Sequence, residues 1–473
     1  EIVAAMSAPL LRLVRGAGGT EWVWCDPSDT SDPDPLACEV REAAKSAAHD
    51  GEPAVELSFS RRLGRYVRAR RAIRRGELLM AAPAGRGLPW TVMDGDAQFC
   101  SAILQQVPGA EEALGLNAPL LALALLVSPH PILSSLSTHR ERLGPAELAL
   151  LTRVAELSGI APDDLLAVAA NAFVITDEAT ATRRVAHGLF PAAAMLSHSC
   201  VPAAAICFAD GGRTLLVRAI SDIPKGGEVS VSYLAEEQLY APWAERRALL
   251  RDGHHFEAEE PAARAASERV AMGAPLATER WRTASGAAPT PATLATLERK
   301  FRAAAEAALR ADAGGDDRSK RAAVEALRSL LHDEIERAVH PTHWIAQEAC
   351  AALVALGRSL DDPGLLSRYS LQLLMVREET LALGTPHLAS LYATHASASF
   401  RLVREGRVPP SKRDELCCQA AAAFDAARRI RTICFGATHP LTEATARASA
   451  AASEAEGLEG SASRSMTGLD LRC

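Results

Sequence analysis

The chain has 473 residues, of which 48% are hydrophobic and 23% charged, which is ordinary for a globular protein of two or three domains. Its formal net charge of −7 gives no reason to expect general binding to nucleic acid. The most apolar run, 119–127, is far shorter than the roughly 20 residues of a membrane span, and no secretory signal is visible. Ten scattered cysteines without a CxxC pair favour reduced thiols in an intracellular protein, cytoplasmic or nuclear.

The N-terminal part changes from loop-like to β-like sequence. The first 50 residues carry an acidic, turn-rich stretch, 26–34, and predict a weakly ordered segment. From Val55 apolar and polar residues alternate, which predicts a strand, and a second strand follows over 65–69. Residues 72–80 predict a hairpin turn that leads into a further apolar strand.

A helical region interrupts this β pattern. Between about 96 and 186 the apolar residues recur with helical spacing, and strand character returns from Ala204 to Tyr233. The helices predicted in this part of the chain cover 120–126, 147–158, 163–173 and, after the strands, 236–251.

The C-terminal part is almost wholly helical and Ala-rich. The stretch 284–291, made of small residues and proline, is the best linker candidate before it. A weak repeat then joins a His to a Pro three times, and its His residues lie 47 and 52 residues apart. Such a recurrence in helical sequence predicts stacked helix pairs. The three copies are His340-Pro341, Pro386-His387 and His439-Pro440.

The most specific pattern lies in the middle of the chain. The run Ser197-His198-Ser199-Cys200-Val201-Pro202 is followed by a strand, a turn at 225–227 and a second strand that ends near Tyr233. This order resembles the C-terminal half of a SET domain, the fold of most protein-lysine methyltransferases, in which the His-Ser-Cys segment is threaded under a loop as a pseudoknot. The family's pattern begins and ends in Asn, where this chain has Ser197 and Ala203.

Three further landmarks narrow the resemblance to the SMYD-type SET proteins. Gly64-Arg65-Tyr66 with Arg75-Gly76-Glu77 is similar to the first SET hairpin, and Asn171-Ala172-Phe173 to an Asn-x-Phe that ends a helix of the inserted region. The His and Pro repeats resemble the tetratricopeptide-like domain that closes these proteins. The resemblance implies an α+β fold: a SET β-core (a β-clip with a pseudoknot) with a helical insertion, followed by an all-α domain.

The expected boundaries follow from these landmarks. The SET domain is expected over 51–260 and the tetratricopeptide-like domain over 292–455, between a weakly ordered segment, 1–50, and a disordered tail, 456–473. Within the SET domain we expect the insertion at about 96–186, the core at 187–235 and a degenerate post-SET part at 236–265.

Two zinc sites of the family are not expected here. A MYND module needs a dense set of ligands, but residues 80–150 offer only one Cys and two His. The post-SET cysteines are replaced by Ala258, Glu260 and Ala263, which leaves Cys200 without thiolate partners. We therefore predict no metal site.

The resemblance implies S-adenosylmethionine as cofactor and a lysine side chain of a protein as substrate. That lysine must be neutral to attack, and a dry channel lowers its pKa from about 10.4. Tyr233 is the candidate catalytic residue, with its hydroxyl beside the transferred methyl group. A tyrosine that only ends a strand is the structural alternative.

The residues expected to hold the cofactor come from the same landmarks. Asn171 would bond its amino-acid end, and Phe256 would lie against the adenine; a helix-terminal Asn and a core Phe are the ordinary alternatives. Ser197 offers a single hydroxyl where the family has an amide, which costs about 1–3 kcal/mol if a buried partner stays unsatisfied. Tyr66 replaces a glycine and either turns outward or fills the pocket. The full candidate set is Gly64, Arg65, Asn171, Ser197, His198, Tyr233 and Phe256.

Two functional hypotheses remain open at this point. The first is a protein-lysine N-methyltransferase that acts on a histone or another protein. The alternative is a catalytically impaired SET scaffold that binds partner peptides through its helical domain, since an Asn, a Gly and the zinc cysteines are replaced. In both cases we expect a monomer that binds neither nucleic acid nor membrane.

Overall fold

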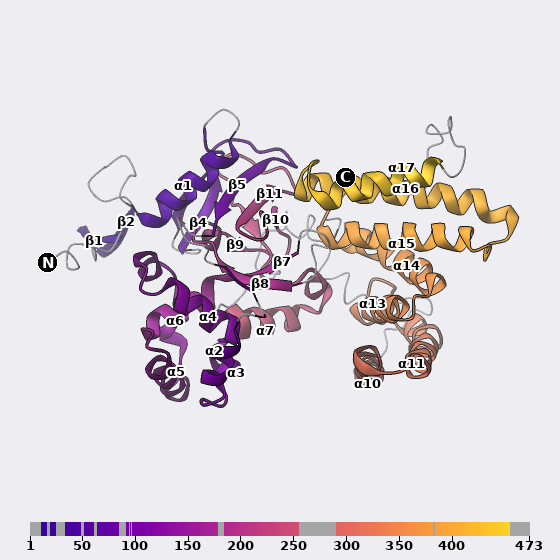
Figure 1. Cartoon of the computed structure of the whole chain (residues 1–473), viewed down its shortest axis with the longest axis horizontal. Helices are drawn as coiled ribbons and strands as arrows, with labels where there is room; N and C mark the ends of the chain where they lie inside the picture. The colour runs from indigo at the N-terminus through magenta and orange to yellow at the C-terminus, as the bar shows by residue number, and fades with distance from the viewer. Residues whose placement is uncertain are drawn as a thin grey trace. The chain divides into compact units, whose positions relative to one another are not determined.

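The computed structural model describes residues 11–16, 19–24, 34–48, 52–60, 64–84, 91–93, 95, 97–177, 184–254, 290–381 and 384–454. These residues divide into two compact units. The first holds the described residues up to Ser232 with 253 and 254, and the second holds 233–252 and 290–454. In the described part of the chain every strand belongs to the first unit, whereas the second is built from helices (Figure 1).

Small antiparallel sheets and one parallel pair make up the β structure. In the sheet β10-β11-β5 the middle strand buries every second residue, so that Leu215, Val217 and Ala219 are inaccessible to solvent. The other groupings are β1-β2, β3-β4, β6-β8-β7 and the parallel pair β9-β12. The strands are β1 Leu11–Gly16, β2 Gly19–Trp24, β3 Val55–Ser60, β4 Gly64–Ala69, β5 Leu78–Pro83, β6 Thr91–Met93, β7 Ala172–Thr176, β8 Arg184–Leu189, β9 Ser197–His198, β10 Ala204–Ala209, β11 Thr214–Ala219 and β12 Ser230–Val231.

Helices cluster between β6 and β7, as the sequence predicts. The most apolar helix, α4, begins where Asn117 accepts a hydrogen bond from the amide of Leu120, at 3.0 Å, and a proline occupies its first turn. The helices and 3₁₀ turns of the first unit are α1 Pro35–Ala47, α2 Gln98–Leu104, α3 Ala110–Leu114, α4 Ala118–Val127, η3 Pro131–Ser135, η4 Arg140–Arg142, α5 Pro145–Ser158, α6 Pro162–Asn171 and η5 Ala193–Met195.

Helix α1 corrects the expectation of a weakly ordered N-terminal segment. Asp34 caps it by accepting from the amide of Leu36 at 2.9 Å, and a proline follows in the first turn. Its inner face, which includes Leu36 and Val40, is fully buried, and the helix packs against β3 and β5. Asp34 is the last residue of the acidic stretch 26–34, which predicts a loop, but an Asp followed by a Pro is equally the start signal of a helix.

The helix expected to reach Phe173 ends two residues earlier. The α6 helix stops at Asn171, and β7 starts at Ala172 and pairs antiparallel with β8. Val174, Ile175 and Thr176 are β-branched, which favours a strand over a helix here. The insertion therefore ends in a strand pair that the helical spacing did not show.

One hydrophobic core joins α1, the sheets and the helical insertion. Phe190 belongs to this core and is inaccessible to solvent. Its ring centroid is 5.9 Å from that of Phe173 in an edge-to-face arrangement and 5.8 Å from that of Phe208. These contacts tie β7 and β10 to the segment that leads into η5.

The second unit starts earlier than the expected domain boundary. The segment expected as post-SET, from 236 on, packs with the C-terminal helices: Glu236 accepts from the amide of His387 at 2.9 Å and from the hydroxyl of Thr385, and Glu237 lies 2.5 Å from the His387 ring. The elements of this unit are η6 Glu236–Tyr240, α7 Trp243–His254, α10 Pro291–Gly314, α11 Asp317–Ser329, the π-helical turn η8 Leu330–Ile335, α12 Glu336–Ala338, α13 Trp344–Ser359, α14 Pro363–Leu381, α15 Pro386–Arg404, α16 Pro410–Phe435 and α17 Pro440–Glu454.

The His and Pro repeats mark the starts of alternate helices. Pro341 precedes α13, Pro386 begins α15 and Pro440 begins α17. Each helix from α13 to α17 packs against the next, and Figure 1 shows α15, α16 and α17 lying side by side. The prediction of successive helix pairs is confirmed, while the narrower tetratricopeptide-like assignment stays a prediction.

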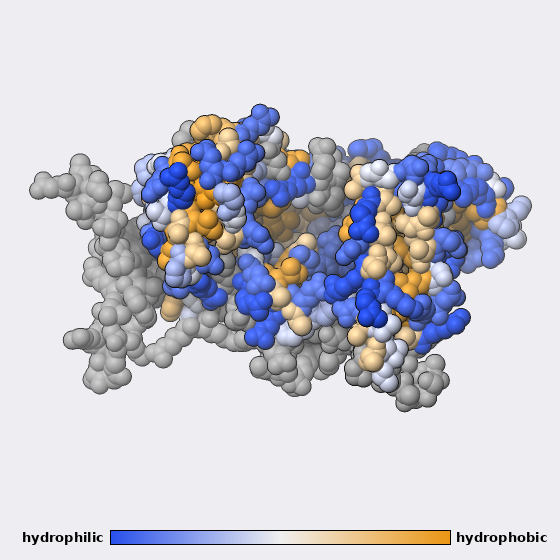
Figure 2. Space-filling model, turned by 90° about the horizontal axis from the view of Figure 1, so that it is seen from below, coloured by the Kyte–Doolittle hydropathy of each residue, from blue (hydrophilic) through white to orange (hydrophobic). Residues whose placement is uncertain are grey.

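Apolar side chains also reach the surface of both units. One face, drawn in Figure 2, shows hydrophobic patches among hydrophilic residues. Phe99, Leu309 and Met375 are 71%, 69% and 61% exposed. Single exposed apolar residues of this kind are normal and mark no site by themselves.

Acidification is expected to destabilise the helical unit through His343. This N-cap of α13 is 2% exposed and accepts from the amide of Ile345 at 3.2 Å. Burial lowers the pKa of His343 to about 4, so that below pH about 6.5 the unfolded chain binds a proton that the folded chain does not. The free energy of unfolding should therefore fall by about 2 kcal/mol between pH 7 and pH 5.

Urea denaturation followed by tryptophan fluorescence at the two pH values measures this loss. In His343→Asn, which keeps an N-cap acceptor but does not titrate, this part of the loss should vanish. The same pH dependence in both proteins would contradict the prediction.

Candidate functional site

The motif residues Ser197 and His198 form β9, which pairs in parallel with β12. Ser197 lies opposite Ser230 and His198 opposite Val231. Beyond β9, the amide of Ser199 donates to the carbonyl of Val231 at 2.9 Å, and that of Ala203 to the carbonyl of Ser230 at 3.1 Å. Two segments some thirty residues apart are thus held together by backbone bonds, as expected for the threaded motif.

The Ser197 side chain has a partner that the sequence did not reveal. Its hydroxyl donates to a carboxylate oxygen of Glu228, a residue just before β12. The backbone of Glu228 also forms a bridge with Arg68 of β4. The Ser197 hydroxyl is therefore occupied as a donor, and a negative charge lies beside it. A carboxylate in this place suits a positively charged amine.

His198 and Cys200 lie next to one another in the same motif. Nε2 of His198 is 3.4 Å from Sγ of Cys200, and Cys200 is 7% exposed. The thiol thus contacts an imidazole of its own segment. In the described part of the chain, no group of three or more His, Cys, Asp or Glu side chains is placed to hold a metal ion.

Arg65 and Asn171 both bind one short segment, 135–137, at the end of η3. Nη2 of Arg65 donates to the carbonyl of Ser135 at 2.5 Å, and Nδ2 of Asn171 donates to the carbonyl of Ser137 at 2.8 Å. Asn171 also donates to the carbonyl of Ala167 at 2.8 Å, so that both amide hydrogens are used. Its carbonyl oxygen is left as the group that can accept from a ligand.

The environment of Arg65 differs from the expected cofactor contact. Burial lowers the pKa of the Arg65 guanidinium, and the nearby Asp34 partly offsets this. The carbonyl that Arg65 binds belongs to Ser135 of η3, which is part of the helical insertion. The Arg65 side chain therefore holds the first hairpin to the insertion.

Gly64 opens β4 in a conformation that favours glycine. Its φ is +67°, and among the described residues other than its chain neighbours no heavy atom lies within 4 Å of the position that a Cβ would take. The backbone here is open to close approach by a ligand. Tyr66, two residues on, pairs with Ser58 and is half-buried.

Adding a side chain at Gly64 is expected to cost stability and cofactor affinity together. Gly64→Ala should lower the free energy of unfolding by about 1–2 kcal/mol, because a left-handed φ strains an alanine. Gly115→Ala is the matched control, with φ +61° and equally open surroundings. Chemical denaturation should give similar losses for both variants, whereas calorimetry with S-adenosylmethionine should show weaker binding in Gly64→Ala alone. Equal affinities of the two variants for S-adenosylmethionine would show that Gly64 does not contribute to a cofactor site.

Tyr233 follows β12 by two residues and begins the second unit. Its side chain is 37% exposed. Phe256, the remaining candidate, lies outside the described residues, as do residues 284–289 of the expected linker, whereas Thr290 caps α10 and Pro291 begins it. In the described residues, no helix is long and apolar enough to cross a membrane.

Comparisons with known proteins identify one domain in this chain. A family model described as SET domain matches residues 64–234, which confirms the predicted SET fold. The SET domain-containing protein SmydA-8 of Drosophila melanogaster is 41% identical over 63 residues, which cover 13% of each chain. The histone-lysine N-methyltransferase SMYD3 of Homo sapiens is 37% identical over 92 residues, 20% of each chain. These two relatives confirm the SMYD-type resemblance, while the matches span only 13% and 20% of their lengths.

A solved structure is also similar to this chain. It is the crystal structure of the SET domain of LSMT bound to lysine and AdoHcy. Its sequence is 12% identical, the TM-score is 0.31, and the match covers 89% of this chain and 92% of that one.

Proposed function

We propose, from the SET domain over residues 64–234, that this protein is an S-adenosylmethionine-dependent protein-lysine N-methyltransferase. The observation that carries the proposal is the parallel pairing of β9 with β12. It brings Ser197 and His198 beside the strand that leads directly into Tyr233. A SET site depends on this arrangement, since cofactor-binding backbone and catalytic tyrosine come from these two segments.

The residues of the first unit fit the amino-acid end of the cofactor. Its α-ammonium needs acceptors and negative charge, and the carbonyl oxygen of Asn171 and the carboxylate of Glu228 are groups of this kind. The open backbone at Gly64 gives space for close approach. Glu228 and Ser197 together would thus take the place of the Asn side chain that the family's pattern has at position 197. S-adenosylmethionine supplies the methyl group.

The remaining work falls to the protein's own groups around the target lysine. The ammonium must lose its proton, and burial in an apolar channel favours the neutral amine. The Tyr233 hydroxyl would accept weak contacts from the methyl hydrogens and keep the reacting atoms aligned. Orientation and exclusion of water therefore account for catalysis in this proposal, without a covalent enzyme intermediate.

Two measurements on the purified chain test the proposal. Calorimetric titration with S-adenosylmethionine should give saturable binding. Incubation with the methyl-labelled cofactor and mixed protein substrates should label lysine side chains. Absence of both binding and transfer would refute the enzyme, and binding without transfer would leave only the cofactor site.

Removal of metal ions is expected to leave the protein unchanged. The prediction rests on the replaced zinc cysteines and on the contact of Cys200 with the His198 ring. Dialysis against a chelator should alter neither Tm nor the rate of methyl transfer. A fall in Tm together with release of zinc would show that a structural zinc site exists.

A further inference from the structure

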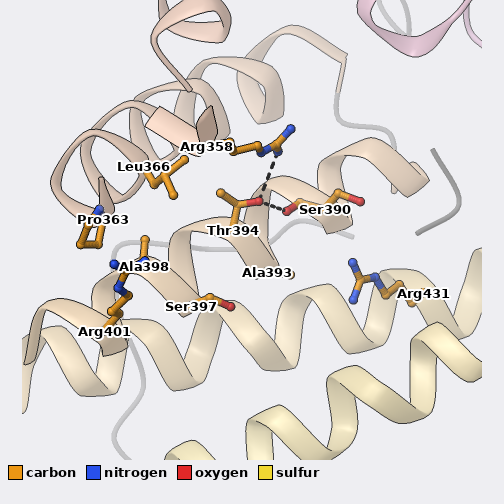
Figure 3. A pocket seen from close by; sticks show the side chains of 10 residues that line it. All are labelled: Arg358, Pro363, Leu366, Ser390, Ala393, Thr394, Ser397, Ala398, Arg401 and Arg431. Carbon is orange, nitrogen blue, oxygen red and sulfur yellow. Dashed lines mark hydrogen bonds between the residues drawn. The ribbon is translucent and has the colours of Figure 1, made fainter. Parts of the chain in front are cut away.

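A pocket in the helical unit has an unusual concentration of arginine. It has a volume of about 390 Å³ and is formed by α13, α14, α15 and α16. Figure 3 shows its three arginines reaching it from three different helices. The lining residues are Arg358, Pro363, Leu366, Ser390, Ala393, Thr394, Ser397, Ala398, Arg401 and Arg431. No acidic side chain is among these described lining residues.

One of the three arginines is already neutralised. Nε of Arg401 donates to Glu405 at 2.6 Å, and its Nη2 donates to the carboxylate of Asp361 at 2.8 Å. Two carboxylates therefore surround this guanidinium, and all of its nitrogens are engaged at the rim of the pocket. Arg401 gives the pocket shape but little free positive charge.

Arg431, unlike Arg401, is not neutralised by a carboxylate of the described residues. It is 7% exposed, its Nη1 donates to the hydroxyl of Thr445, and its Nε has no hydrogen-bond partner in the described residues. No carboxylate of the described chain forms an ion pair with it, and burial lowers the pKa of Arg431 to about 10. A buried guanidinium without a counter-ion is costly. A bound anion would relieve this cost.

Arg358 contributes a second cation that forms no ion pair in the described residues; burial lowers its pKa, and the charge of Glu237 partly offsets this. Its Nη2 donates to the Thr394 hydroxyl at 3.3 Å, a weak contact, and Thr394 in turn donates to the carbonyl of Ser390 at 2.8 Å. The described residues provide no ion pair for Arg358. Its side chain is exposed, so that it can move to meet a ligand. The pocket thus presents two guanidinium groups, Arg358 and Arg431, that no ion pair of the described residues neutralises.

The rest of the lining decides what kind of anion fits. Pro363, Leu366, Ala393 and Ala398 provide an apolar wall, and the volume exceeds that of a single carboxylate or phosphate. We propose that the pocket binds an acidic segment of a partner protein, with a Glu or Asp carboxylate between Arg431 and Arg358 and aliphatic side chains on the apolar wall. This site is independent of methyl transfer.

Binding of a short fluorescein-labelled peptide of alternating glutamate and leucine, followed by anisotropy, tests the proposal. The expected result is saturable binding that a glutamine-leucine peptide of the same length does not show. Arg358→Gln and Arg431→Met should each raise Kd about 10-fold or more, as expected for a charge-assisted hydrogen bond. Arg429→Gln is the matched control, because it removes an exposed arginine of the same helix that pairs with Asp425, and it should leave Kd unchanged.

Three results would overturn the proposal: equal binding of the two peptides, equal weakening by Arg429→Gln and Arg431→Met, or displacement of the peptide by inorganic phosphate at the peptide's own concentration. The last result would assign the pocket to a free anion. If circular dichroism shows that Arg431→Met does not fold, Arg358→Gln decides, since an exposed residue can be replaced without disturbing the core. An unchanged Kd in that variant would refute the site.

Discussion

Replacing Tyr233 with phenylalanine is expected to lower the rate of methyl transfer by about 10²–10³-fold, the usual cost of removing one preorganised oxygen from an active site. The dissociation constant for S-adenosylmethionine should change little, because the variant keeps the aromatic ring. Initial rates at saturating cofactor and calorimetry separate the two effects. A large loss in rate with retained affinity is what an alignment role for the hydroxyl requires.

Tyr392→Phe provides the matched control for this experiment. The Tyr392 hydroxyl is buried in α15 without a hydrogen-bond partner in the described residues, and the residue is 4% exposed. Its removal should leave the rate unchanged and the free energy of unfolding equal or slightly higher. If Tyr233→Phe were as active as Tyr392→Phe, Tyr233 would not be catalytic. Unaltered cellular function in an inactive Tyr233→Phe would favour the scaffold hypothesis.

Replacing Phe190 with alanine is expected to lower the free energy of unfolding by about 3–5 kcal/mol. Its ring is fully buried and contacts Phe173 and Phe208. It also covers Gly188, where a Cβ would lie 2.8 Å from Cε2 of Phe190. The truncated side chain therefore leaves a cavity that neighbouring groups fill only in part, and urea denaturation measures the loss.

Phe99→Ala is the control for the core substitution. Phe99 lies on α2 and is 71% exposed, so that its truncation should alter stability by no more than about 0.5 kcal/mol. Equal losses in the two variants would show that Phe190 is not part of the core. Calorimetry with S-adenosylmethionine on Phe190→Ala would also show whether this core residue supports cofactor binding, because Phe190 lies shortly before η5 and the motif strand β9.

Local patterns in the sequence predicted much of this fold. Alternation of apolar residues from Val55 correctly predicted the strand β3, and strand character after Ala204 correctly predicted β10 and β11, whereas the helical spacing overran the end of α6 at Asn171 by two residues. The prolines of the His and Pro repeats were correctly interpreted as periodic, and in the structure they mark helix starts. These features depend on neighbours within one helix or strand, which is why periodicity shows them.

Other features depend on contacts that no spacing reveals. Arg65 binds Ser135 and Asn171 binds Ser137, so that two candidate residues are engaged by one segment at the end of η3. The pairing of Ser197 with Glu228 likewise joins positions 31 residues apart. The tertiary fold sets these distances, and sequence can only name the groups that could take part.

The parallel pairing of β9 with β12 also orders events during synthesis. The hairpin β10-β11 needs only its own residues and can form as soon as it leaves the ribosome, since its contacts are local. β9 has no partner strand until Ser230 and Val231 have been made. A nascent chain that stops before Ser230 can therefore fold the hairpin but leaves Ser197 and His198 without their neighbours. The Ser197 and His198 end of the proposed site is thus among the last parts of the first unit to assemble.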